Sequence, residues 1–124
     1  MTLSLTLNKS TTALPGETWA THPRYGHINV SNLGRVRNMN TGNIIGRITG
    51  GTRSGKPAPV EEKYISATIK GKTIPVHVLV LETFVGERPD GHEPDHLNFN
   101  RHDNRLVNLA WVTTSENQRR KRRR

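Results

Sequence analysis

Cysteine is absent from this chain, and aromatic residues make up only 5% of its 124 positions. Without cysteine, disulfide bonds and thiolate-bound zinc are excluded. Because only 31% of the residues are hydrophobic, we expect a thin core and a fold that relies on a metal ion or a partner for order. No apolar run approaches the roughly 20 residues that a membrane-spanning helix needs, and residues 1–14 lack the basic start of a signal peptide. We therefore expect a cytoplasmic protein of one domain, or of two very small ones, that is neither secreted nor bound to a membrane.

Positive charge is in excess, with 19 Lys and Arg against 10 Asp and Glu and a formal charge of +9. Six of the positive charges lie in the tail, residues 119–124, and the rest of the chain carries 13 basic against 10 acidic residues, or +3. A polyanion is the expected partner, because Lys and Arg contacts release counterions from a phosphate backbone. A solubilising or nuclear-targeting run is the alternative interpretation of the tail.

The first part of the sequence predicts small antiparallel β structure. Residues 1–16 are rich in Ser and Thr, end in Pro-Gly, and predict a loose arm or an added strand. Residues 28–31 alternate as in a strand, and residues 32–34 predict a turn in which the glycine takes a positive φ. A second strand is expected to start at Arg35. Since side chains alternate along a strand, Arg35 and Arg37 should share one face and make this hairpin basic on that side.

The middle of the chain predicts a loop, a hairpin and a helix. Residues 49–57 are dominated by Gly, Ser, Thr and Lys, which predicts a flexible loop. Residues 64–69 and 73–76 flank a Lys-Gly-Lys turn and predict a second hairpin. Residues 77–85 are apolar and favour a helix, because large apolar side chains recur at a spacing of four.

The last part carries a long polar stretch followed by strong local signals. Residues 87–108 are polar without periodicity, which is typical of a functional loop. Residues 109–112 predict a short strand. Thr113 and Glu116 form a Thr-x-x-Glu capping box that opens a helix, so Asn117 falls near the start of that helix.

Four residues in this part suit the hydrolysis of a phosphodiester. Asp95 and His96 are neighbours, and Asn108 and Asn117 follow Asp95 at +13 and +22. If the two short strands pair and the helix crosses them, Asp95 and Asn117 can converge, and two oxygen donors suit Mg²⁺ or Mn²⁺ better than zinc. His96 points to the other side of its strand and stays free as a base, with an ordinary pKa near 6.5. A surface loop that happens to contain Asp and His is the alternative.

Two motifs in the same order resemble the HNH endonucleases, and most closely the intron-type homing endonucleases of phages. The segments that carry the nuclease resemblance are Val76-His77, Phe84-Val85, Asp95-His96-Leu97-Asn98, residues 104–113 and Ser115-Glu116-Asn117. Residues 17–19 and 30–37 are similar to NUMOD4, the small DNA-binding module that precedes the nuclease in such proteins.

The resemblance, which covers roughly residues 17–118, implies an α+β fold. A small antiparallel β module is followed by a ββα-metal nuclease unit, also called the HNH or His-Me finger. The domains expected from it are an arm at 1–16, a NUMOD4-like module at 17–72, the nuclease unit at 73–118 and a basic tail at 119–124.

The resemblance also implies roles for single residues. His96 would be the general base, Asp95 and Asn117 the metal ligands, and Asn108 the residue that orients the loop and the catalytic histidine. Asn117 stands where the family name expects histidine, and an amide oxygen favours Mg²⁺, with Mn²⁺ as the alternative ion. The implied activity is metal-dependent cleavage of double-stranded DNA, with nicking by a monomer and double-strand cutting by a homodimer or by two visits.

Several alternatives stay open at this level. Asn104 could organise the loop in place of Asn108, and Arg105 could clamp the scissile phosphate or be a solvated charge. His77 is expected to have a structural or DNA-backbone role rather than a catalytic one. A zinc site built only from histidines is also open, from His92, His96 and His102.

Basic residues outside the motif predict how DNA is held. Arg35 and Arg37 on one hairpin face could enter the major groove or bind phosphates, because a two-stranded ribbon fits that groove. The other predicted DNA contacts are Lys63, Lys70, Lys72, Arg105, Arg119 and Arg120. The alternative function is a noncatalytic DNA-binding or packaging-accessory protein with a degenerate nuclease unit. An RNA-binding module is disfavoured, because scarce aromatic residues offer few stacking surfaces for bases.

Overall fold

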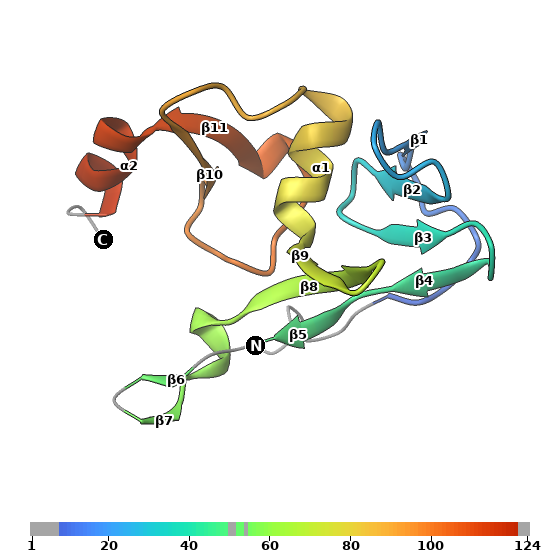
Figure 1. Ribbon diagram of the computed structural model, residues 1–124, viewed down its shortest axis with the longest axis horizontal. Coiled ribbons are helices and arrows are strands. Elements are labelled where there is room, and N and C mark those ends of the chain that lie inside the picture. Colours follow the sequence, from blue (N-terminus) through green and yellow to red (C-terminus); the bar gives the residue numbers. More distant parts are fainter. Residues whose placement is uncertain (1–7, 50–51, 54, 122–124) are drawn as a thin grey trace.

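A computed structural model describes residues 8–49, 52–53 and 55–121 of the chain. The first unit is an antiparallel sheet whose strands lie in sequential order (Figure 1). These strands are β1 (Trp19–Thr21), β2 (Ile28–Ser31), β3 (Val36–Asn38) and β4 (Asn43–Ile45). Ile28, Val30 and Val36 are almost fully buried, so the alternation of β2 and β3 turns one face of the sheet to the core.

The turn between β2 and β3 forms as predicted. The Ser31 hydroxyl oxygen accepts hydrogen bonds from the backbone N–H of Leu33 and of Arg35, both at 3.1 Å. Gly34 takes a φ of +86°, which residues with a Cβ rarely adopt. A serine before the turn and a glycine within it therefore fix the shape of this hairpin.

The second sheet has the order β5-β8-β9 and is also antiparallel. Its strands are β5 (Arg47–Thr49), β8 (Tyr64–Ile69) and β9 (Lys72–Pro75). Lys70 and Gly71 join β8 to β9 with φ values of +50° and +80°. Two successive positive φ values are the mark of a type I′ turn. The predicted second hairpin is confirmed.

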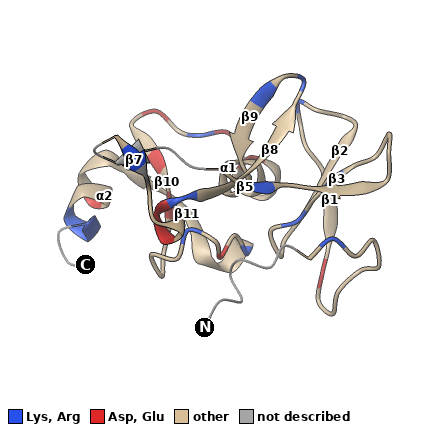
Figure 2. Cartoon of the chain, turned by 90° about the horizontal axis from the view of Figure 1, so that it is seen from below, with Lys and Arg blue, Asp and Glu red and all other residues tan. Residues whose placement is uncertain are grey.

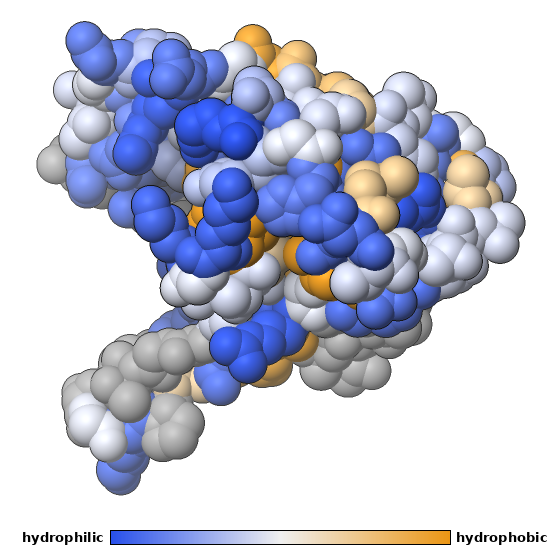
Figure 3. All heavy atoms as spheres, turned by 45° about the vertical axis from the view of Figure 1, so that its right-hand side comes forward, coloured by the Kyte–Doolittle hydropathy of each residue, from blue (hydrophilic) through white to orange (hydrophobic). Residues whose placement is uncertain are grey.

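The segment that was predicted to be a flexible loop contains regular structure. A small hairpin, β6 (Thr52–Arg53) with β7 (Lys56–Pro57), precedes the 3-10 helix η2 (Val60–Glu62). The hairpin projects from the body of the molecule (Figures 1 and 3). The loop prediction is wrong for these strands, because two residues are too few to leave a visible alternation.

The C-terminal part begins with a helix, as predicted. The elements are α1 (Val76–Phe84), β10 (His92–His96), η3 (Leu106–Asn108), β11 (Leu109–Thr113) and α2 (Thr114–Lys121). The N–H groups of Val85 and Gly86 both donate to the Leu81 carbonyl at 2.9 Å and end α1. Residues 87–108 were expected to lack regular structure, and β10 corrects this. The sequence of β10 is polar throughout and shows no alternation of apolar and polar residues, so the strand is recognised only by its pairing with β11.

One hydrophobic core joins these units. Leu79, Val80 and Leu81 of α1 have 0% exposure and pack with buried residues of β2, β8 and β11. The α+β architecture is therefore confirmed, and α1 lies at its centre (Figure 1). The predicted division between residues 72 and 73 falls inside β9, which pairs with β8. Within the described ranges, no helix is long and apolar enough to cross a membrane.

Candidate active site

Strands β10 and β11 and helix α2 form a ββα unit at the end of the chain. The strands pair antiparallel, with Asp95 opposite Ala110 and His96 opposite Leu109. The Thr113 hydroxyl oxygen accepts the N–H of Glu116 at 3.1 Å, which confirms the predicted cap of α2. In Figure 2 the acidic residues of β10 (red) lie near α2, whose last turn is basic (blue).

Alternation along β10 turns its acidic residues toward α2. Asn117 donates its amide N–H to Glu93 Oε1 at 2.9 Å, and Arg120 donates Nε–H to Asp95 Oδ2 at 2.5 Å. Asp95 and Asn117 are both buried, with 6% and 5% exposure. The structure therefore brings the two predicted ligands to the same interface between strand and helix.

The oxygen atoms at this interface suit a hard divalent cation. The hydrogen bond to Glu93 uses the amide nitrogen of Asn117, which leaves the amide oxygen as the atom with lone pairs for a cation. Asp95 supplies carboxylate oxygens, one of which Arg120 holds. One carboxylate and one amide, completed by water and phosphate oxygens, fit Mg²⁺ or Mn²⁺.

Glu93 is a neighbour of the site that the motif did not single out. It lies two residues before Asp95 on the same strand face, and that spacing is the signal that could have identified it. The hydrogen bond from Asn117 is the main cause that lowers the pKa of Glu93 below its usual value. Glu93 therefore stays ionised and orients the Asn117 amide.

Asn108 organises the loop that follows β10. Its Oδ1 accepts the N–H of Asn98 at 3.0 Å, and its Nδ2 donates to Asn98 Oδ1 at 2.9 Å and to the Asp103 carbonyl at 2.8 Å. Its carbonyl also accepts the N–H of Leu97 at 2.8 Å. These bonds close the segment between β10 and β11, which is the loop part of the role expected for Asn108.

His96 is oriented by a different asparagine. Its Nε2 lies 2.7 Å from Oδ1 of Asn104, and both residues are buried, with 5% and 4% exposure. Because an amide oxygen only accepts, this bond forms when Nε2 carries the proton and the lone pair is on Nδ1. From the sequence, Asn104 was an alternative to Asn108 as the residue that organises the loop. In the structure both residues have a role: Asn104 binds His96, and Asn108 binds the loop.

Burial lowers the pKa of His96, although the hydrogen bond to Asn104 and the charge of Asp95 act in the opposite direction. The expectation of an ordinary pKa is corrected, because the strand places the ring inside the protein and not at its surface. A lowered pKa keeps the imidazole neutral at neutral pH. The neutral ring therefore has a lone pair on Nδ1 at neutral pH, and no deprotonation of the imidazole is needed first.

His77 and Tyr64 form a wall beside the His96 ring. The ring centroids of His77 and His96 are 4.5 Å apart, and Tyr64 stacks on His77 at 5.3 Å. Burial, followed by the nearby His96 and Arg101, lowers the pKa of His77 to about 3. Its Nδ1 is buried and has no hydrogen-bond partner in the part of the chain described. A neutral, buried His77 agrees with the structural role expected for it.

Arg101 is a cation near His96 that the sequence reasoning missed. Its guanidinium lies 5.0 Å from the ring centroid of Tyr64 and donates to the Glu62 carbonyl at 2.5 Å. The polar composition of the loop gave no signal to distinguish it from Arg105. Arg105, the predicted clamp, is about half exposed and pairs with Asp103 at 2.7 Å.

The histidine-only zinc site does not form. His92 Nδ1 bonds to the Asp90 carbonyl at 2.9 Å, and His102 Nε2 bonds to the Lys63 carbonyl at 3.2 Å. No group of three His, Cys, Asp or Glu that could hold a metal ion occurs among residues 8–49, 52–53 and 55–121.

Arg35 has a structural role and not the predicted DNA contact. Its guanidinium is 7% exposed and forms a two-bond ion pair with Glu17, at 2.6 and 2.7 Å. It also donates to the carbonyls of Asn8, Ser10 and Thr12. Residues 8–12 of the predicted arm are thus fastened to the sheet, because the shared face of Arg35 and Arg37 meets the arm.

Arg37 lies on the same face, as alternation predicted. It is half-buried, with its guanidinium 4.3 Å from the Trp19 ring centroid, and it donates to the Thr11 carbonyl at 3.0 Å. Lys70 and Lys72 are exposed at the β8–β9 turn, roughly 17 Å along β8 from Tyr64. Lys70 and Lys72 therefore lie at the end of the β8–β9 hairpin away from Tyr64, the residue that stacks near His96. Arg119 is exposed on α2, 3.6 Å from Glu116.

Comparisons with known proteins show what this unit is similar to. Residues 75–119, which run from the start of α1 to α2, match the family model described as HNH endonuclease. The resemblance to the HNH endonucleases is confirmed. An uncharacterised HNH endonuclease of Acanthamoeba polyphaga mimivirus is 37% identical over 95 residues, which are 71% of this chain and 21% of that protein.

A solved structure extends the similarity beyond the HNH unit. A structure of DNA binding and cleavage by the HNH homing endonuclease I-HmuI matches 85% of this chain, with a TM-score of 0.65 and 26% sequence identity. The match covers 57% of the I-HmuI chain. This chain thus spans about a fifth of the viral relative and somewhat more than half of the solved one. Because most of the chain matches, the similarity includes β structure that precedes residue 75.

Proposed function

We propose that this chain is a metal-dependent DNA endonuclease of the HNH class. The observation that carries the proposal is a buried histidine, His96, held in one tautomer beside a carboxylate at a strand–helix interface. The family match of residues 75–119 and the similarity to I-HmuI support it. Double-stranded DNA is the proposed substrate, and the excess of basic residues supports a polyanion.

In the proposed reaction, the Nδ1 lone pair of His96 takes a proton from water. The water oxygen attacks phosphorus in line, the bond from phosphorus to the 3′ oxygen breaks, and that oxygen takes a proton from solvent. The products are a 5′ phosphate and a 3′ hydroxyl. Asp95 and Asn117 would hold the divalent cation, Mg²⁺ or Mn²⁺, which when bound polarises the scissile phosphate and stabilises the leaving oxygen.

Arg120 has a second place in this proposal. Its guanidinium donates to Asp95, donates to the Leu97 carbonyl at 2.8 Å, and lies 4.9 Å from the Phe99 ring centroid. It has to leave the Asp95 oxygen before that oxygen can serve as a ligand. The released guanidinium is then available to a DNA phosphate, which is the contact predicted for it.

The test is nicking of supercoiled plasmid by the wild type, His96→Ala and the control His92→Ala, with Mg²⁺ and with EDTA. We expect His96→Ala to lose about 10²- to 10⁴-fold in rate, which is the usual worth of a general base, and to keep DNA affinity in fluorescence anisotropy. His92→Ala should cut like the wild type, because His92 lies on the same strand outside the site. A monomer with one site should give open circles before linear DNA.

One observation favours the alternative of a noncatalytic DNA-binding protein. The pair between Arg120 and Asp95 satisfies the carboxylate without a metal, as a degenerate site would. Tight DNA binding with no cutting under Mg²⁺ or Mn²⁺ would establish this alternative. Equal cutting by the wild type and His96→Ala would also refute the proposed base.

A further inference from the structure

The loop that carries Asn104 touches the N-terminal sheet at the turn between β2 and β3. A Cβ built on Gly34 would lie 2.8 Å from the carbonyl carbon, the carbonyl oxygen and the Cβ of Asn104. Two residues further on, the N–H of Leu106 donates to the Asn32 carbonyl at 2.8 Å. The turn therefore holds the loop by a backbone hydrogen bond and by a contact that only glycine permits.

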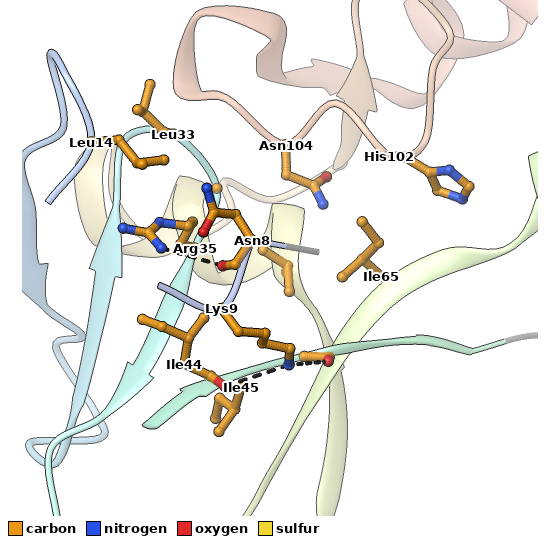
Figure 4. A pocket seen from close by; sticks show the side chains of 13 residues that line it. Asn8, Lys9, Leu14, Leu33, Arg35, Ile44, Ile45, Ile65, His102 and Asn104 are labelled. Atoms are coloured by element: carbon orange, nitrogen blue, oxygen red, sulfur yellow. Dashed lines mark hydrogen bonds between the residues drawn. The ribbon is translucent and has the colours of Figure 1, made fainter. Parts of the chain in front are cut away.

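Without this contact, the side chain of Asn104 would have room to move. Asn104 lines a cavity of about 210 Å³ between the sheet and the loop, together with Leu33, Gly34 and His102 (Figure 4). An open cavity beside Asn104 does not restrict the rotamer of its side chain as close packing would. The close packing of Gly34 on the backbone, and the hydrogen bond to His96, are then what fix the amide.

From this chain of contacts we infer that Asn104 is a positioning residue for His96, and that the turn of residues 32–34 sets its position. The turn of the N-terminal sheet packs on Asn104, and Asn104 Oδ1 selects the tautomer of His96 that has its proton on Nε2. A shift of the turn is thereby transmitted to the ring through two contacts. The consequence for catalysis rests on the proposed function, whereas the effect on the tautomer does not.

The chain offers a matched control for the turn. Gly34 and Gly42 both lie in turns of the first sheet with positive φ, at +86° and +77°, but a Cβ on Gly42 would meet nothing within 4 Å. Alanine at either position strains the backbone in a similar way, because both glycines have a positive φ. Only Gly34→Ala also pushes on Asn104, so the difference between the two variants isolates the contact.

The first measurement is the tautomer of His96 by long-range ¹H–¹⁵N correlation spectra, in which a protonated and an unprotonated ring nitrogen have distinct shifts. The spectrum of His96→Ala identifies the signals. We expect Nε2–H in the wild type, in Gly42→Ala and in Asn104→Asp, which keeps an acceptor oxygen. Asn104→Ala and Gly34→Ala should show a mixture of both tautomers.

The second measurement is nicking kinetics. Asn104→Ala should lower kcat by about 10- to 100-fold, as loss of an orienting partner does for metal-bound histidines, with little change in KM. Asn104→Asp should restore at least part of kcat. Gly34→Ala should lower kcat and Gly42→Ala should not.

The outcomes separate the inference from the proposed function. An unchanged tautomer in Asn104→Ala refutes the role of Asn104, and identical spectra of Gly34→Ala and Gly42→Ala refute the role of the turn. If Asn104→Ala does not fold, the spectra of Gly34→Ala and Gly42→Ala still test whether the turn sets the tautomer of His96, because both variants retain Asn104. A changed tautomer in a protein that never cuts DNA supports the positioning and refutes the nuclease.

Discussion

The ion pair of Glu17 and Arg35 predicts how the stability of this protein depends on pH. The Glu17 side chain has 0% exposure, and Arg35 with its hydrogen bond is the main cause that lowers the pKa of Glu17 from 4.5 to about 2. Each tenfold change in proton affinity is worth about 1.4 kcal/mol. The pair therefore contributes about 3 kcal/mol to the free energy of unfolding at neutral pH.

The sign follows from the lowered pKa. Above pH 4.5, Glu17 is ionised in both the folded and the unfolded chain, and the contribution is fully present. As the pH falls from 4.5 to about 2, the unfolded chain takes up the proton first, and the contribution is lost. Other carboxylates titrate in the same range, so the wild type alone cannot isolate Glu17.

The perturbation is Glu17→Gln, which removes the charge and keeps the shape. We expect it to lower the free energy of unfolding by about 3 kcal/mol at pH 7, measured by urea denaturation. The difference from the wild type should shrink by at least about half at pH 3. The exposed Glu61 gives the control Glu61→Gln, which should change stability by less than about 0.5 kcal/mol at either pH.

A difference between wild type and Glu17→Gln that stays constant from pH 7 to pH 3 would refute the reasoning, because the carboxylate would then not titrate as part of the pair. Protease sensitivity supplies a second readout. Arg35 binds the carbonyls of Asn8, Ser10 and Thr12. A protease should therefore cleave residues 8–12 faster in Glu17→Gln than in the wild type. Equal rates of cleavage would show that the pair of Glu17 and Arg35 does not hold the arm.

Two further predictions concern α2. Arg120→Gln should raise the affinity for Mn²⁺ in the absence of DNA, because Asp95 loses its cationic partner. An increase of roughly fivefold, or about 1 kcal/mol, is expected in calorimetric titration, and unchanged or weaker binding would show that the two do not compete. Thr113→Ala should cost about 1 kcal/mol, because it removes the hydroxyl that caps Glu116 N–H. Amide exchange should become faster in α2 but not in α1, and equal acceleration in both would contradict a local cap.

Local signals in the sequence predicted local structure well. The serine and glycine of the β2–β3 turn, the Lys-Gly turn of β8–β9 and the Thr-x-x-Glu box of α2 each act over four residues or fewer. The face that a strand side chain takes also follows from alternation alone. Asp95 and His96 therefore point to opposite sides, toward α2 and toward the His77 ring.

What the sequence could not predict is which group each face meets. Arg35 and Arg37 alternate in the same way whether their face meets DNA or the arm, and the arm occupies it. Asn104 and Asn108 are both buried amides in one loop, and no spacing rule separates their partners. In the folded chain Asn104 is distinguished by its close contact with Gly34, a residue 70 positions earlier in the sequence.

The predicted boundary at residue 73 does not divide two cores, because one hydrophobic cluster includes residues from both sides of it. Val76, Leu79 and Val80 of α1 belong to one cluster with Val30 of the first sheet and Leu109 of the ββα unit. A short chain with few apolar residues gains more from one shared core than from two small ones. The helix inside the HNH family match is thus also the helix on which the N-terminal sheet packs. A fold built in this way places the turn of the N-terminal sheet against the loop that carries Asn104, without a separate linker.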